Sequence, residues 1–384
     1  MTQIYLDNGA TTKVADEVAK EVLRYFTELY GNASSSHNFG ESANEGLERA
    51  RIIIAKSLNA DIDEIYFTSG GTESDNIAIR GTAYANKDKG NHIITSVIEH
   101  PAVLSTCKEL EQEGVEVTYL HVDSYGLINP NELISAIKDT TILVSIMSAN
   151  NEIGTIQPIT EIGEICSRQN ILFHTDSVQA FTKVPIDVKK QKISLASFSG
   201  HKIHAPKGIG AIYIKKGVKV SPLLFGGSQE KKLRPGTENI PGIVGFAKAV
   251  ELALRDGISG VERLTKLRNK LIDGILKISG TKLNGHPTKR LCMNANISFE
   301  GIKGETLLYE LNRNGIAVSS GSACAAKSSK PSHVLTAIGL GCEKYPATIR
   351  FTLSRYTTED EIEYTIKIVT NIVEGLRREI EVVH

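Results

Sequence analysis

Two charged side chains that follow apolar strands indicate the chemistry this chain could carry. Lys202 stands shortly after the apolar run 193–198, and Asp176 follows the apolar run 171–173. Small molecules bind to α/β enzymes where strands end and loops begin. A cofactor with a pyridine ring and an aldehyde needs an amine that forms a Schiff base and an acid that keeps the ring nitrogen protonated. The alternatives are a solvated loop lysine and an aspartate that caps a turn.

A glycine-rich turn near residue 70 could hold a phosphate group. Gly71 and Thr72 lie in Thr-Ser-Gly-Gly-Thr-Glu-Ser, which connects an expected strand to an expected helix. Glycine lets the backbone approach an anion, and the start of a helix offers free N–H groups. Ser199 and His201 flank Lys202 and are suitable phosphate donors. A plain strand-to-helix turn with a Thr or Ser cap explains residues 68–74 equally well.

Three further residues follow buried strands and could face a flat ring or a substrate. His100 precedes Pro101 at a strand-to-helix junction, where an imidazole could stack on a ring or move protons. Gln179 could contact a ring hydroxyl, and Asn151 a cofactor hydroxyl or a substrate carboxylate. The alternatives are a capping histidine and an asparagine-rich turn.

Arg350 lies on the polar face of the expected strand 348–354, opposite Ile349 and Phe351. A guanidinium group on such a face favours a carboxylate, which it can bind through two hydrogen bonds. A structural ion pair is the alternative.

Cys324 stands in a stretch of almost entirely small residues, 318–332. Such a stretch buries little surface, so we expect it to be mobile. Lys327 and Lys330 favour the thiolate form. A thiol on such a loop could reach a substrate and carry a group away, whereas the alternative is a chance cysteine in a surface loop.

Composition limits the classes of partner and location. The chain has 384 residues, with Lys plus Arg and Asp plus Glu at 44 each, so no broad attraction to nucleic acid is expected. No apolar run is long enough to span a membrane, and the N-terminus does not resemble a signal peptide. The five cysteines show no metal-ligand spacing and predict free thiols in the cytoplasm.

Hydrophobic periodicity predicts an α/β fold of two domains. Expected strands alternate with helices, which indicates a mainly parallel, seven-stranded sheet flanked by helices. The strands are expected at 64–68, 92–97, 117–121, 142–147, 171–174, 193–198 and 211–214, and the helices at 73–85, 102–113, 130–138 and 159–169. These form a large domain, 15–255. Residues 1–14 and 256–384 form a smaller α+β domain, with helices at 261–279, 305–314 and 358–380 and strands at 293–299 and 348–354.

Taken in order along the chain, the motifs resemble those of the cysteine desulfurases of NifS/IscS type. These enzymes belong to the class-V aminotransferase branch of the fold-type I pyridoxal-phosphate enzymes. The resemblance covers nearly the whole chain and is carried by Tyr-Leu-Asp-Asn-Gly-Ala-Thr-Thr (5–12), the turn 68–74, Glu-His-Pro (99–101), Asn-Asn-Glu-Ile-Gly (150–154), His-Thr-Asp-Ser-Val-Gln (174–179), Ser-Gly-His-Lys (199–202), Arg-Pro-Gly-Thr-Glu-Asn (234–239) and Ser-Gly-Ser-Ala-Cys (320–324).

The resemblance implies pyridoxal 5′-phosphate as cofactor and assigns roles to individual residues. Lys202 would bind the cofactor covalently, Asp176 would pair with the ring nitrogen, and Gln179 with the ring oxygen. The phosphate would be held by Gly71, Thr72, Ser199 and His201, together with Thr237 from across a homodimer interface. His100 would stack on the ring and assist proton transfer. Asn151 and Arg350 would hold the substrate carboxylate, and Cys324 would receive the sulfur.

The implied reaction converts L-cysteine to L-alanine and leaves a persulfide on Cys324. This sulfur would pass to an acceptor protein, such as a scaffold for iron–sulfur cluster assembly, or to thiolation. Whether Cys324 also ligates a transient cluster stays open. The alternatives are a selenocysteine lyase, another class-V enzyme such as an aminotransferase, and a non-catalytic sulfur-relay scaffold.

Overall fold

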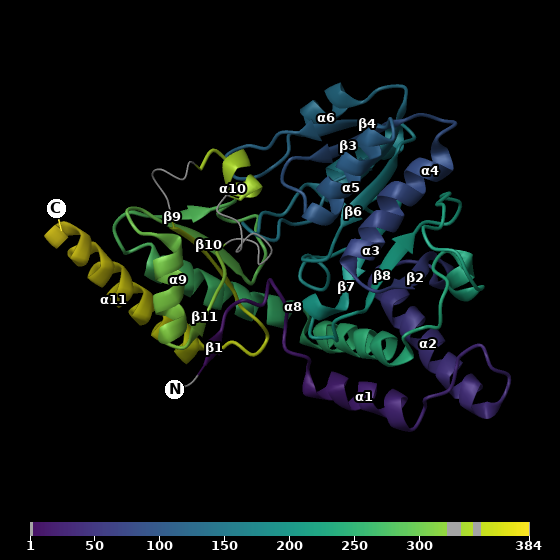
Figure 1. The fold of residues 1–384 in the computed structure, drawn as a ribbon, viewed down its shortest axis with the longest axis horizontal. Coiled ribbons are helices and arrows are strands. Elements are labelled where there is room, and N and C mark those ends of the chain that lie inside the picture. Colours follow the sequence, from purple (N-terminus) through teal and green to yellow (C-terminus); the bar gives the residue numbers. More distant parts are fainter. Residues whose placement is uncertain (1–2, 321–331, 341–346, 384) are drawn as a thin grey trace.

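Two parts of unequal size are joined by one long helix in the structure, which is a computed structural model (Figure 1). It describes residues 3–320, 332–340 and 347–383. Cys324 and Cys342 therefore lie outside the described residues. Within the described ranges, no helix has both the length and the apolar character needed to cross a bilayer.

The larger part is built on a seven-stranded sheet, as the sequence predicts. Its strands lie in the order β2-β8-β7-β6-β5-β3-β4. All pairs are parallel except those of β8, which runs antiparallel to both neighbours. The strands are β2 (Ile65–Thr68), β3 (His92–Ser96), β4 (Glu116–Leu120), β5 (Thr141–Ser145), β6 (Leu172–Asp176), β7 (Leu195–Ser199) and β8 (Gly210–Ile214).

Both faces of this sheet are apolar because helices cover both. In β3, Ile94 packs into the core on one face and Ile93 into the core on the other. Tyr213 and Ile212 divide in the same way along β8. Such continuous apolar strands are typical of sheets buried on two sides. The polar side chains are left for the strand ends, where the candidate site lies.

The helices of the larger part form two layers around the sheet. α2 (Asn38–Ser57) and α7 (Ile159–Arg168) contribute to one core, and α5 (Pro101–Gln112) to the other. The predicted helix 73–85 is divided into α3 (Gly71–Asn76), a π-helical turn η2 (Ile77–Gly81) and α4 (Thr82–Asn86). The remaining helices are α1 (Asp16–Thr27), which the sequence patterns did not predict, α6 (Pro130–Ala136) and the short turns η1 (Ile62–Glu64), η3 (Gly200–Lys202) and η4 (Gln229–Lys232).

The smaller part has its own sheets and core. The antiparallel sheet β12-β10-β9 contains β9 (Thr281–Asn284), β10 (Asn294–Phe299) and β12 (Ala347–Thr352), and β1 (Ile4–Tyr5) pairs in parallel with β11 (Ile316–Ala317). Its helices are α9 (Gly304–Arg313), α10 (His333–Ala337) and α11 (Glu359–Val383). Thr358 and Glu361 form a capping box at the start of α11, with hydrogen bonds of 2.9 and 3.2 Å.

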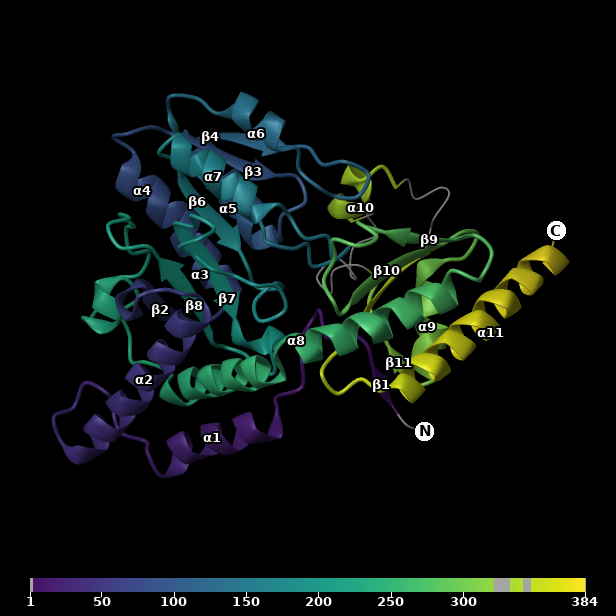
Figure 2. The same ribbon diagram turned by 180° about the vertical axis from the view of Figure 1, so that it is seen from behind.

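Helix α8 (Ile240–Ile275) joins the two parts, as Figure 2 shows from behind. It begins well before the predicted helix 261–279. Phe246 packs into the core of the larger part and Leu271 into that of the smaller part. Between them Gly257 kinks the helix with a φ of 54°, a conformation that glycine adopts without a steric penalty. The predicted domain boundary at residue 255 falls beside this kink, and the division itself stays a prediction.

A buried ion pair anchors the segment that carries Thr237. Arg51 of α2 donates to both carboxylate oxygens of Glu230, at 2.8 and 2.9 Å. The backbone N–H of Phe67 in β2 donates to the same carboxylate at 2.8 Å. Glu230 itself adopts a φ of 44°, so this contact holds a strained turn against the sheet.

We expect Glu230→Gln to lower the free energy of unfolding by about 3–5 kcal/mol, because it leaves the buried Arg51 charge without its partner. Denaturant unfolding of the purified protein measures this loss. Asp63→Asn removes the exposed partner of Lys231 and should change stability little. Equal effects of the two variants would contradict the expectation.

Candidate active site

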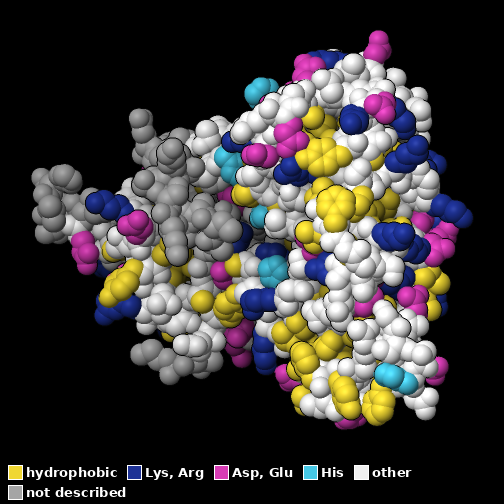
Figure 3. All heavy atoms as spheres, turned by 45° about the vertical axis from the view of Figure 1, so that its right-hand side comes forward, with side chains coloured by type: hydrophobic (Ala, Val, Ile, Leu, Met, Phe, Trp, Pro, Cys, Tyr) yellow, Lys and Arg dark blue, Asp and Glu magenta, His cyan; other side chains and the backbone are white. Residues whose placement is uncertain are grey.

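A cavity of about 250 Å³ lies at the ends of β6 and β7, where the two parts meet. Ten of the twelve residues that the sequence analysis selected line it. They are Gly71, Thr72, His100, Asn151, Asp176, Gln179, Ser199, His201, Lys202 and Arg350. Figure 3 shows Lys or Arg and His side chains together in the hollow between the two parts.

Lys202 ends the short turn η3, directly after β7. Its Nζ donates to the carbonyl oxygens of Gly9 at 2.7 Å and Ala10 at 2.8 Å. Burial lowers the pKa of Lys202 to about 8, and the nearby charges of Arg350 and Lys183 contribute. The amine is therefore partly neutral near physiological pH, as a nucleophile requires.

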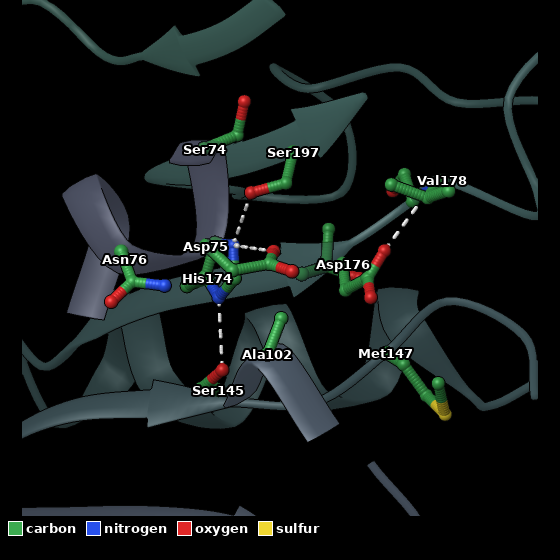
Figure 4. Close-up of polar contacts among 12 residues, drawn as sticks. Ser74, Asp75, Asn76, Ala102, Ser145, Met147, His174, Asp176, Val178 and Ser197 are labelled. Carbon is green, nitrogen blue, oxygen red and sulfur yellow. Dashed lines mark hydrogen bonds and ion pairs between the residues drawn. The ribbon is translucent and has the colours of Figure 1, made fainter. Parts of the chain in front are cut away.

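Asp176 ends β6 and reaches the same cavity, fully buried. One of its oxygens accepts the backbone N–H of Val178 at 2.9 Å (Figure 4). Burial raises the pKa of Asp176, while the charges of His100 and Lys202 oppose this rise. Its carboxyl group is thus held at the cavity wall beside two basic side chains, Lys202 and His100.

His100 is the N-cap of α5, and its Nδ1 accepts the backbone N–H of Ala102 at 3.1 Å. Burial lowers the pKa of His100, and so does the charge of Lys202. The ring therefore caps a helix and also lines the cavity. Its predicted stacking on the cofactor ring and its role in proton transfer stay predictions.

Small residues and hydrogen-bond donors also line the cavity. Gly71 begins α3, and a Cβ atom there would lie 2.7 Å from Cγ2 of Val178, so a side chain would collide with the cavity wall. Ser199 and His201 line the same cavity, and burial lowers the pKa of His201 to about 4. The imidazole is therefore neutral, with one N–H available for donation.

Arg350 crosses from the smaller part to the cavity with only part of its hydrogen-bonding capacity used. Its Nη2 donates to Asp7 Oδ1 and its Nη1 to the carbonyl of Asn151, both at 3.0 Å. Its Nε has no hydrogen-bond partner among the described residues. The structural ion pair considered from the sequence therefore exists, and one donor is still unused. Gln179 is likewise engaged, since its Nε2 donates to the carbonyl of Gly9 at 2.9 Å.

Two selected residues are not among the described residues that line this cavity. Thr237 is exposed and does not line it. Because Thr237 was expected to act across a dimer interface, its assignment stays a prediction. Cys324 lies outside the described residues, and its role stays a prediction as well.

Comparison with known proteins identifies the family. The family model for class-V aminotransferases matches residues 4–365. A cysteine desulfurase IscS of Methanosarcina thermophila is 56% identical over 374 residues, covering 97% of this chain and 93% of that protein. The chain belongs to the class-V aminotransferases, among the cysteine desulfurases.

Solved structures of desulfurase-like proteins share the fold. A NifS-like protein superposes with a TM-score of 0.92 at 40% identity, covering 97% of this chain and all (100%) of that one. A structure of SspA in complex with cysteine gives a TM-score of 0.82 at 37% identity, with 93% and 100% coverage. The predicted fold class is thereby confirmed.

The cavity of this desulfurase fits pyridoxal phosphate by the chemistry of its side chains. Such enzymes bind the cofactor through a lysine, with an acidic partner at the pyridine nitrogen. Lys202 and Asp176 supply these groups from consecutive strand ends. The glycine at position 71 leaves room beside Ser199 and His201, where a phosphate would need both space and donors.

Sequence analysis missed several residues of the desulfurase site. Gly9 and Ala10 hold Lys202 through their carbonyls, and Asp7 holds Arg350. The motif 5–12 marked this segment, but no pattern in it showed that it reaches the ends of strands far along the chain. Asp75 and Met147 also line the cavity. Asp75 lies four residues after Gly71, but the sequence pattern did not identify it, because a position on a helix does not by itself show whether a carboxyl group is buried or exposed.

A larger cavity of about 570 Å³ lies on the other side of Lys202. Its other lysine, Lys183, donates to the carbonyls of Gln179 and Lys202 at 3.2 and 3.1 Å. No carboxyl group among its lining residues faces that lysine as Asp176 faces Lys202. The smaller cavity therefore has the better chemistry for the cofactor.

We expect the capture of pyridoxal phosphate by the apoprotein, trapped with borohydride, to rise about tenfold per pH unit below pH 8 and to level off above it. The reason is that only the neutral amine of Lys202 reacts. Peptide mass analysis separates labelling at Lys202 from labelling at Lys183. Incorporation that kept rising to about pH 10, as for an ordinary lysine, would contradict the lowered pKa.

Proposed function

We propose that this chain removes sulfur from L-cysteine, releases L-alanine and leaves a persulfide on Cys324. The observation that carries this proposal is a partly neutral Lys202 and a buried Asp176 in one cavity that Arg350 also lines. Relatives that are more than 50% identical to this chain support the proposal, since they are named cysteine desulfurases. A neighbour of the same fold is described in complex with cysteine.

The residues of the cavity divide the work of this reaction. Bound pyridoxal phosphate supplies an electron sink for the substrate's α carbon. Asp176 keeps a proton at the ring nitrogen, where its carboxylate faces the cavity. The amine of Lys202, when it is neutral, would accept the proton of the substrate's α carbon and return it. His100 is a second group at the wall that can hold or give a proton.

Arg350 and Asn151 are proposed to hold the substrate carboxylate. Arg350 is fixed by Asp7 and by the carbonyl of Asn151, so its guanidinium group cannot turn away. Its Nε lacks a partner among the described residues and can donate a hydrogen bond to a carboxylate. A fixed donor aimed at an anion loses little entropy on binding.

The described chain that precedes Cys324 supports a role for this residue at the cavity. Ser319 pairs with Arg350 through two backbone hydrogen bonds, of 3.3 and 2.7 Å. Cys324 follows Ser319 by five residues, and a chain of that length spans at most about 17 Å. Its thiolate would form the new S–S bond as the substrate's carbon–sulfur bond breaks, so that the sulfur remains on Cys324.

We further propose that the enzyme acts as a homodimer and passes its sulfur to an acceptor protein, such as an iron–sulfur scaffold. Phe225, which is 89% exposed, and Leu224 precede Thr237 in the same segment. Exposed apolar side chains also gather near α1 and α2, in the lower part of Figure 3. Such patches mark contact surfaces in soluble proteins. The predicted cytoplasmic location stays a prediction.

We expect Cys324→Ala to abolish release of sulfur from cysteine while the visible absorbance of bound cofactor stays unchanged. The thiolate is lost, but the cavity keeps all of its lining residues. Sulfide and alanine assays with mass analysis of the persulfide measure the effect. Cys166→Ala, which alters a buried thiol in the core, is the control. Undiminished sulfur release by Cys324→Ala would refute the assignment.

We expect Arg350→Lys to raise the KM for cysteine about 10- to 100-fold and to affect kcat less. The loss of charge-assisted hydrogen bonds to a carboxylate costs about 1.5–3 kcal/mol, which corresponds to this range. Steady-state kinetics measures both constants. Arg355→Lys, at an arginine paired with Asp256, is the matched control. An unchanged KM in Arg350→Lys would exclude a role in carboxylate binding.

A further inference from the structure

One buried carboxyl group at the cavity wall has no part in the scheme above. Asp75 lies in the last turn of α3 with 1% of its surface exposed, and it lines the cavity. Figure 4 shows it beside His174 and Asp176, which lie two residues apart on one face of β6. Ser197 of β7 is paired with Asp176 in the sheet. Asp75 thus belongs to a polar cluster directly behind the residue proposed to hold the ring nitrogen.

His174 does not provide a charge for Asp75. Its Nδ1 is hydrogen-bonded to Ser145 Oγ at 2.9 Å and its Nε2 to Ser197 Oγ at 3.0 Å. Burial lowers the pKa of His174 to about 3, so the ring is neutral. Oδ1 of Asp75 lies 3.7 Å from Nε2 of His174 and has no hydrogen-bond partner among the described residues. The contact is therefore not an ion pair.

The two buried aspartates have opposite electrostatic surroundings. Asp176 faces Lys202 and His100 and accepts a backbone N–H. The charged neighbours of Asp75 are Asp176 and Glu99, both acidic, and only the Ser197 hydroxyl opposes them. Burial, followed by the charge of Asp176, raises the pKa of Asp75 well above its usual range. Glu99 contributes less, and burial raises its own pKa to about 8. When two carboxyl groups share a buried site, one ionises and the other keeps its proton.

We propose that Asp75 is a positioning residue that stays protonated behind the ring-binding carboxylate and leaves Asp176 as the only anion at the ring nitrogen. This inference rests on the proposed function, because that function gives Asp176 its place at the ring. A second anion in the cluster would oppose the negative charge that the ring must accept from the substrate. The neutral His174 serves the same end, since it fills the space behind Asp176 without adding charge.

Infrared difference spectra of the holoenzyme test which aspartate carries the charge. Parent minus Asp75→Asn should show the C=O stretch of a protonated carboxyl, which shifts in D₂O. Parent minus Asp176→Asn should show the bands of an ionised carboxylate. Carboxylate bands in the Asp75→Asn difference spectrum would overturn the proposal. If Asp75→Asn does not fold, Asp75→Ser gives the same comparison.

Thermal unfolding of the holoenzyme gives a second, independent test. When a carboxyl group has a higher pKa in the folded than in the unfolded protein, the free energy of unfolding falls as the pH rises from the unfolded-state pKa to the folded-state pKa. Asp75→Asn cannot ionise, so its Tm relative to the parent should increase with pH above about pH 4, the ordinary pKa of an aspartate, and level off only above the raised pKa of Asp75. Glu230→Gln is the matched control, a carboxyl-to-amide change at a buried site that has a cation. The Tm of Glu230→Gln should lie below that of the parent over the whole pH range, and the difference should not become more favourable as the pH rises.

The coupling to Asp176 distinguishes a positioning role from simple packing. In an Asp176→Asn background, Asp75 loses its nearest negative neighbour, and its pKa should fall. The gain in Tm from adding Asp75→Asn should then level off at a lower pH than in the parent background. Identical profiles in the two backgrounds would show that Asp75 does not sense Asp176. These measurements do not use cysteine turnover, so they stand even if the proposed reaction is wrong.

Discussion

Charged groups held away from water are the constraint on which the rest of this structure depends. The amine of Lys202 donates hydrogen bonds to two backbone carbonyls. The guanidinium group of Arg350 donates one to a carboxylate and one to a carbonyl. A buried charge is tolerated only when it has such partners. Because Lys202 follows the sheet, Arg350 belongs to the smaller part and most of their partners belong to the N-terminal segment, the cavity exists only when all three have come together.

The N-terminal segment supplies most of the partners of these buried charges, although it is short. Ile4 pairs with β11 in the smaller part, and Asp7 binds Arg350. A few residues later, the carbonyls of Gly9 and Ala10 hold Lys202, and Thr12 donates to the carbonyl of His201. One short stretch of chain thus connects the carboxylate-binding arginine to the cofactor-binding lysine.

The sequence allowed all seven strands of the sheet to be predicted, because strands buried on both faces are apolar runs that end in polar residues. It did not show their order or the antiparallel direction of β8. It also identified ten residues of the cavity, since each follows a strand end or resembles a family motif. It could not show the contact of Asp7 with Arg350, which joins positions 343 residues apart. Nor did the helical pattern after Gly71 reveal a π-helical turn. That turn ends at Gly81, where a Cβ atom would lie 2.5 Å from a side-chain carbon of Val220.

Helix α8 has a consequence for how the molecule comes apart. Its first half completes the core that holds Phe246, and its second half completes the core that holds Leu271. If either core is lost, the half of α8 that packs on it loses its packing surface. The other half of the same helix is still part of the remaining core. The kink at Gly257 redirects the helix axis without interrupting the chain between the cores. Melting of one part therefore weakens the other, so a shared helix links the two into a single cooperative unit.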